Sequence, residues 1–94
     1  MDVAINSNTL VAQVMDLLAA EIDGETIMLN IENGMYYQLD VTGSRIWDLL
    51  GEQRRVSELI SNLVEEYNVQ PEQCCSDTLK FIREIWDEGL VRLD

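Results

Sequence analysis

The hydrophobic periodicity of this chain changes once, near residue 41, and the change divides the sequence into a strand half and a helix half. Three short apolar stretches precede it, at residues 17–22, 26–31 and 35–39. They are separated by Asp23-Gly24 and by Glu32-Asn33-Gly34, which are typical hairpin connections. After residue 41, apolar residues recur every three or four positions, as in amphipathic helices. The sequence therefore predicts an α+β fold, in which a three-stranded antiparallel meander precedes three helices.

The first turn sets the register of the first hairpin, because successive strand side chains point to opposite faces of a sheet. A two-residue turn at Asp23-Gly24 pairs Leu18 with Leu29, and it pairs Ala20 with Ile27. The buried face of the middle strand is then predicted to be Ile27, Leu29 and Ile31, with Met28 and Glu21 pointing outward.

The second hairpin admits two loop lengths. A two-residue Asn33-Gly34 turn would pair Leu29 with Gln38 and bury the amide. A three-residue loop, Glu32-Asn33-Gly34, keeps apolar side chains on one face, and Gly34 suits the left-handed conformation that such a loop needs. We therefore favour the longer loop, which pairs Ile31 with Met35, Leu29 with Tyr37 and Ile27 with Leu39, and places Tyr36 and Gln38 on the opposite face.

Three helices are predicted in the second half of the chain. Ile46, Trp47, Leu49 and Leu50 form a short helix that Gly51 ends, and a second helix spans residues 56–67. Pro71 begins the third helix and Gly89 closes it. Residues 90–93 are either a covering strand or a tail. At 94 residues the chain is expected to be a single domain, with residues 1–16 as a loose N-terminal arm or, at Val3–Ile5, a short edge strand.

The third predicted helix carries two apolar stripes about 90° apart. One stripe contains Cys75, Leu79, Ile82 and Trp86. The other contains Cys74, Thr78, Phe81 and Ile85, and it is bordered by Asp77, Glu84 and Glu88. Either the helix buries both stripes in a small core, or the second stripe forms the wall of an apolar groove with an acidic rim.

The third predicted strand has an open edge. Residues 35–39 contain neither charge nor Pro, which are the usual means of blocking such an edge. An extended peptide can add there as a further strand, and its alternate side chains would then lie between sheet and helix. The peptide-binding residues predicted on this basis are Met35, Tyr36, Tyr37, Gln38, Leu39, Cys74, Asp77, Thr78, Phe81, Glu84, Ile85 and Glu88.

The charge distribution argues against several classes of ligand. The formal net charge is −12, and residues 1–44 contain seven Asp or Glu but no Lys or Arg. This distribution argues against a nucleic-acid partner, because binding to phosphates needs clustered basic residues. The acidic surface either keeps the protein soluble or attracts a basic partner. No apolar run is long enough to cross a membrane and no secretory signal is evident, so we expect a cytoplasmic protein.

Catalysis and cofactor binding find little support in the sequence. The chain has no His, which is the commonest general base. Cys74 near a helix start is a weak candidate nucleophile without a His partner. Cys74 and Cys75 are adjacent, so they cannot both point into one zinc site from a helix, and no calcium-loop pattern is present. We therefore expect no enzyme activity, no metal and no cofactor.

Five ordered motifs resemble those of the PqqD-like family. They are GMYYQLD at 34–40, GSRIWDLL at 43–50, VSEL at 56–59, CxxDxLxF at 74–81 and GLV at 89–91. Each motif is weak alone, but their order and gaps are fairly specific, and the resemblance covers roughly residues 17–93. The departures are Cys75 and Arg55, where members often have Thr or Ser to cap the second helix.

The resemblance implies a recognition element for a ribosomally made precursor peptide, with a winged helix-turn-helix outline. It is most similar to the free-standing leader-binding subunits of lasso-peptide biosynthesis. The implied partners are a Lys-rich leader peptide with a Tyr-x-x-Pro element and a leader peptidase or other modifying enzyme. The alternative is a structural subunit permanently docked on an enzyme, such as a radical enzyme, without independent leader binding. A monomer or a strand-swapped dimer is expected.

Overall fold

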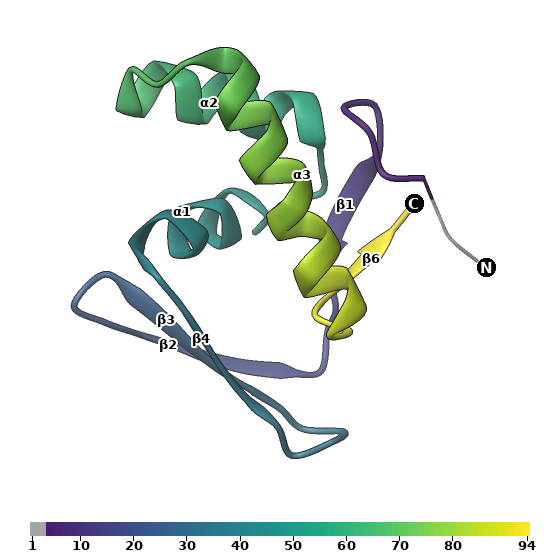
Figure 1. Cartoon of the computed structure of the whole chain (residues 1–94). Coiled ribbons are helices and arrows are strands. Elements are labelled where there is room, and N and C mark those ends of the chain that lie inside the picture. Colours follow the sequence, from purple (N-terminus) through teal and green to yellow (C-terminus); the bar gives the residue numbers. More distant parts are fainter. Residues whose placement is uncertain (1–3) are drawn as a thin grey trace.

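The computed structural model describes residues 4–94 and has the predicted order of a hairpin sheet followed by three helices (Figure 1). In this part of the chain the elements are β1 (Leu10–Gln13), β2 (Leu17–Ile22), β3 (Glu25–Asn30), β4 (Tyr36–Leu39), α1 (Val41–Leu49), β5 (Arg54–Arg55), α2 (Val56–Tyr67), α3 (Pro71–Asp87) and β6 (Val91–Leu93). The expected α+β class is confirmed. All three helices lie on one side of the β2-β3-β4 sheet (Figure 1).

A second small sheet, of order β5-β1-β6, was not expected from the sequence, although residues 90–93 were considered as a covering strand and Val91–Leu93 do form β6. Its central strand is β1, so part of the region considered as a loose arm is instead built into the fold. Val11 is fully buried there, and Val11 pairs with Arg54 on one side and Leu93 on the other. No turn signal marks β1 in the sequence, because both of its partner strands are distant along the chain. Of the possible edge strand Val3–Ile5, Val3 lies outside the described residues, and Ile5 is irregular and packs against the core.

The first hairpin has the predicted register, with Leu18 opposite Leu29 and Ala20 opposite Ile27. Its turn residues Asp23 and Gly24 both have positive φ, of 54° and 81°. Two consecutive positive φ angles are what a tight turn needs to match the twist of the flanking strands.

The predicted register of the second hairpin is wrong by one residue. Met28 pairs with Tyr37 and Leu29 with Tyr36, so four residues, 31–34, connect the strands rather than three. The cause is the side chain of Asn30, whose Oδ1 accepts hydrogen bonds from the backbone N–H groups of Glu32, at 3.0 Å, and Asn33, at 3.4 Å. Such an Asx turn stabilises a longer loop than the apolar pattern alone favours.

The shifted register reverses the predicted buried face of β3. Met28 is fully buried and Ile27 is only half-buried, whereas Ile31 is 58% exposed in the loop. Thr26 and Asn30 share the inner face with Met28. A slip of one residue exchanges the two faces of a strand, which accounts for all of these differences together. In β4 the prediction holds, because Leu39 is buried while Tyr36 and Gln38 are exposed.

Ser44 in α1 joins the helices to the end of the hairpin sheet. Its buried hydroxyl accepts a hydrogen bond from the Thr26 N–H at 2.7 Å and donates one to the Leu39 carbonyl at 3.2 Å. The hydroxyl therefore closes the β3–β4 ladder where a direct backbone bond would otherwise be needed.

Replacing Ser44 with Ala should destabilise the protein by about 1–3 kcal/mol, because the buried Thr26 N–H loses its acceptor. Chemical denaturation of both proteins measures the loss. The exposed helical position Ser61 offers the matched control, since Ser61→Ala removes a hydroxyl without removing a buried partner. Equal stabilities of the two variants would mean that the bridge contributes nothing.

Candidate functional site

A groove of about 760 Å³ runs between β4 and the C-terminal half of α3. The β2-β3-β4 sheet ends at β4, so one edge of β4 is unpaired beside this groove. The lining comprises Met35, Tyr36, Tyr37, Gln38, Leu39, Asp40, Phe81, Glu84, Ile85, Asp87, Glu88 and Leu90. The predicted open strand edge and the predicted groove are thus neighbours in the structure.

The hydrogen-bonding groups of β4 alternate between its two edges. The Asn30 N–H donates to the Met35 carbonyl at 2.9 Å, which makes Met35 a residue whose carbonyl faces β3. In an antiparallel ladder every second residue has its N–H and C=O on the same edge, so those of Tyr37 and Leu39 also face β3. The backbone N–H and C=O groups of Tyr36 and Gln38 therefore point toward the open edge, where an added strand would find them.

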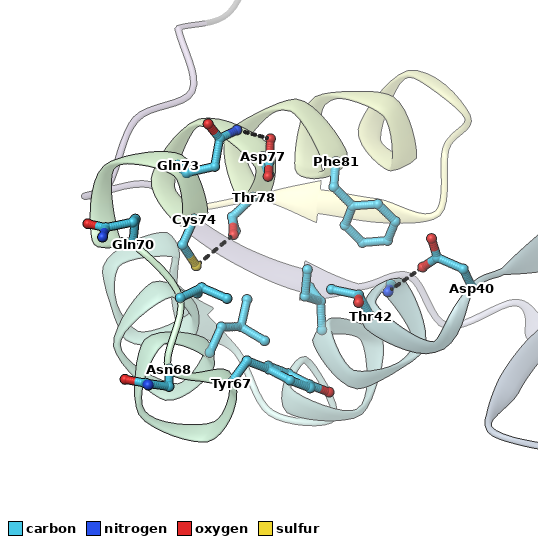
Figure 2. Close-up of a pocket in the computed structure, with 14 residues that line it drawn as sticks. Asp40, Thr42, Tyr67, Asn68, Gln70, Gln73, Cys74, Asp77, Thr78 and Phe81 are labelled. Atoms are coloured by element: carbon cyan, nitrogen blue, oxygen red, sulfur yellow. Dashed lines mark hydrogen bonds between the residues drawn. The ribbon is translucent and has the colours of Figure 1, made fainter.

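A second cavity, of about 810 Å³, lies where α1, the end of α2 and the start of α3 meet (Figure 2). Its lining is Asp40, Thr42, Gly43, Ile46, Leu63, Tyr67, Asn68, Val69, Gln70, Gln73, Cys74, Asp77, Thr78 and Phe81. Asp40 and Phe81 belong to both linings, so the groove and the cavity meet at these two residues. Together they form a trough along one face of α3.

Phe81 stands at the junction of the groove and the cavity because Gly43 leaves room for its ring. A Cβ on Gly43 would lie only 3.0 Å from Cε1 of Phe81. The same backbone is fixed by Asp40, the N-cap of α1, whose Oδ1 accepts a hydrogen bond from the Gly43 N–H at 2.7 Å (Figure 2). The first turn of α1 and the ring of Phe81 are thus packed as one unit.

Gly43→Ala should move the Phe81 ring while leaving the fold nearly as stable, because the clash opposes the helix propensity gained, about 1 kcal/mol. We expect ligand binding in the trough to weaken roughly tenfold, since a shift of Phe81 alters both the groove and the cavity. Binding is measured for Gly43→Ala in the wild-type and Phe81→Leu backgrounds. Equal effects in both backgrounds would show that the added methyl group acts elsewhere than on the ring.

Both predicted stripes of α3 contain buried and half-buried residues. Cys74, Thr78 and Ile85, assigned to the groove stripe, are buried, and Phe81 is half-buried. In the other stripe Ile82 is fully buried, whereas Cys75, Leu79 and Trp86 are half-buried. The most buried line of the helix therefore runs between the predicted stripes. Cys74, Thr78 and Ile85 form the floor of the trough, and Phe81 projects into it.

The rim of the trough is acidic. Glu84, Asp87 and Glu88 line the groove from α3, and neither lining contains Lys or Arg. At the other end, Asp77 accepts a hydrogen bond from Gln73 at 2.9 Å. Carboxylates beside a partly apolar cleft produce a negative potential there, which favours a ligand that carries positive charge.

An ion pair joins α1 to α2 next to the cavity residues Ile46 and Tyr67. Arg45 of α1 donates two hydrogen bonds to Glu66 of α2, from Nη2 at 2.6 Å and from Nε at 2.9 Å. These bonds lower the pKa of Glu66 and raise that of Arg45. Because a lowered carboxylate pKa contributes stability above its unfolded value, the pair is present at neutral pH and weakens as pH falls through the folded pKa.

The structure places all twelve predicted site residues along the trough. Nine of them line the groove, and Cys74, Asp77 and Thr78 line the cavity, with Phe81 shared by both. Sequence reasoning missed Asp40, Asp87 and Leu90 in the groove and the cavity residues from α1 and α2. Of these residues, Asp40 could have been predicted, because an Asp three positions before Gly43 at the start of a helix is typical of an N-cap.

Metal-binding clusters and membrane-spanning helices are absent from residues 4–94. In this part of the chain no group of three His, Cys, Asp or Glu side chains is placed to hold a metal ion. None of the described helices combines the length and the hydropathy that a membrane span requires. Cys74 and Cys75 are both free thiols.

The comparisons with known proteins agree with this architecture. The family model for coenzyme PQQ synthesis protein D (PqqD) matches residues 25–91. A solved structure described as TbiB1 in complex with the TbiA(beta) leader peptide is 32% identical, with a TM-score of 0.81, covering 86% of this chain and 94% of that one. A lasso peptide synthetase B1 complexed with the leader peptide is 20% identical, with a TM-score of 0.75, covering 87% and 96%, and shows the same fold. No curated protein matches the chain significantly.

Proposed function

The chain belongs to the PqqD family, and from that premise we propose that it is a non-catalytic adaptor that binds the leader segment of a ribosomally made precursor peptide. The observation that carries the proposal is the open edge of β4 beside a groove with an apolar floor. An extended peptide adding to β4 gains backbone hydrogen bonds at Tyr36 and Gln38, and its alternate side chains enter the trough. The neighbour with 32% identity, whose description names a leader peptide, supports this ligand class.

The edge of β4 suits strand addition better than the other edge of the same sheet, at β2. Beneath β2 the cavity is only about 270 Å³, lined by Gln13, Ala19, Ala20, Glu21, Thr26, Trp47, Asp48 and Gly51. Its aromatic lining residue, Trp47, is buried and only 6% exposed, whereas the ring of Phe81 is half-buried and lines both the groove and the cavity. A peptide at β2 would gain backbone bonds but little side-chain burial, so affinity and specificity favour β4.

The acidic rim suits a basic leader. Glu84, Asp87 and Glu88 lie where the side chains of a peptide on β4 would meet α3. A Lys-rich leader with a Tyr-x-x-Pro element fits both the charge and the apolar trough. In this proposal the protein works in the cytoplasm and delivers the peptide to a leader peptidase of the lasso-peptide type. Its proposed binding residues are the twelve predicted from the sequence, each of which lines the groove or the cavity.

The test is calorimetric titration of the purified protein with the leader peptide encoded beside it and with a scrambled peptide of the same composition. Saturable one-to-one binding of the leader alone is expected. Absence of binding by the folded protein would favour the second candidate, a structural subunit that is permanently docked on a modifying enzyme. Sedimentation of the free protein separates the monomer from a strand-swapped dimer in the same preparation.

A further inference from the structure

The outer face of the β2-β3-β4 sheet, opposite the core, is largely apolar. Directly paired residues of an antiparallel sheet point to the same side. Because Met28 is buried on the inner face, the row of Leu18, Leu29 and Tyr36 lies on the outer face. The neighbouring row contains Ala20, Ile27 and Gln38, and Ile22 follows at the end of β2.

Much of this apolar surface is accessible. Leu18 is 59% exposed, Ile22 is 56% exposed and Tyr36 is 72% exposed. Nothing within residues 4–94 covers this side, since the three helices pack on the other side of the sheet (Figure 1). Contiguous exposed apolar side chains on a small protein commonly mark a surface where another protein binds.

Acidic residues stand at both ends of this surface. Asp23 and Glu25 lie at the β2–β3 turn, and the Glu25 carboxylate accepts a hydrogen bond from the outer-face residue Gln38 at 3.2 Å. Asp16 and Glu32 lie at the opposite end, where the Ile31 N–H donates to the Asp16 carbonyl. Residues 1–44 contain no Lys or Arg to balance these charges.

The charges select among possible occupants. A second copy of the chain would bring together two molecules of net charge −12 with like charges at both ends of the contact. An anionic membrane surface is repelled for the same reason. A protein with an apolar projection flanked by Lys or Arg satisfies both the apolar centre and the acidic ends.

We propose that the outer face of the β2-β3-β4 sheet is a docking surface for the enzyme that processes the captured peptide, and that this enzyme presents an apolar projection flanked by basic residues. The identity of the partner rests on the proposed function. The groove opens beside β4, whereas this face is centred on β2 and β3, so peptide and enzyme can be bound at once although Tyr36 and Gln38 border both surfaces. Leu18 and Ile22 are on β2, away from the open edge of β4, and therefore separate the two surfaces in an experiment.

The test uses the full chain, the leader peptide and the purified leader peptidase encoded beside it. The double variant Leu18→Glu/Ile22→Glu should bind leader within about twofold of wild type but bind the peptidase at least roughly tenfold more weakly, because charges replace the apolar centre. Ser61→Glu, on the exposed surface of α2, adds charge away from the sheet and should bind both as wild type does. If the double glutamate variant does not fold, the double variant Leu18→Ser/Ile22→Ser is used in its place.

Unchanged peptidase affinity in the double variant would overturn the proposal, as would a wild-type dimer that the double variant dissociates. If the wild-type protein does not bind leader but the double variant still binds the peptidase more weakly, the docking face is supported and the leader-binding function is contradicted. If leader binds to the wild-type protein, and substitution of Phe81 weakens peptidase binding while the double variant does not, the enzyme contacts the trough. That result would exclude the outer face.

Discussion

Phe81→Asp is expected to weaken leader binding by at least about 100-fold, the largest effect on binding that we expect from any single substitution. Phe81 belongs to the linings of both the groove and the cavity, so a carboxylate there places an unpaired charge in the apolar part of both. It also adds negative charge beside Asp40 and Glu84, where the structure already lacks a basic residue. Calorimetric titration with the leader peptide measures the loss.

The fold should survive this substitution, because Phe81 is half-buried and its ring faces the trough rather than the centre of the core. Far-UV circular dichroism and thermal unfolding check that point. Phe81→Leu is the matched control, since it keeps an apolar side chain and should cost about tenfold or less. A melting temperature that falls in parallel with affinity would show that Phe81 acts as a core residue and not as part of a binding surface.

Met28→Ala is expected to have the largest effect on stability, a loss of about 2–5 kcal/mol. Met28 is fully buried at the centre of β3, where it faces the helices and pairs with Tyr37 of β4. For a domain of this size such a loss lowers the melting temperature by roughly 10–30 °C. Thermal and denaturant unfolding monitored by circular dichroism provide the measurement.

Ile27→Ala is the matched control, because Ile27 is the adjacent β3 residue and lies half-buried on the outer face. Its loss should be smaller, about 1–2 kcal/mol, since its side chain is already partly in contact with water and truncating it leaves no enclosed cavity. The two substitutions therefore report the register directly. A greater loss of stability for Ile27→Ala than for Met28→Ala would instead support the three-residue loop that the sequence pattern favours.

The sequence alone predicted half of the residues that line the trough. The uncharged stretch 35–39, the second stripe of α3 and the three acidic residues that border this stripe make up all twelve predicted residues, and the structure places them along one trough. These signals are local, because strand alternation and helical spacing depend only on neighbouring residues. The cavity residues Leu63 and Tyr67 had no such signal, since their contribution depends on how α2 packs against α3.

By itself, then, the sequence determined the order of the three meander strands and the three helices, the first hairpin register, the acidic charge and half of the trough lining. Only the tertiary structure decided which face of β3 is buried. Asn30 lengthens the second loop and Ser44 of α1 closes the ladder at Thr26, and both outweigh the apolar pattern. It also decided that β1 is a central strand, because its partners β5 and β6 come from distant parts of the chain. Apolar periodicity reports local preference, whereas buried polar groups must be satisfied by whichever partners the completed fold brings to them.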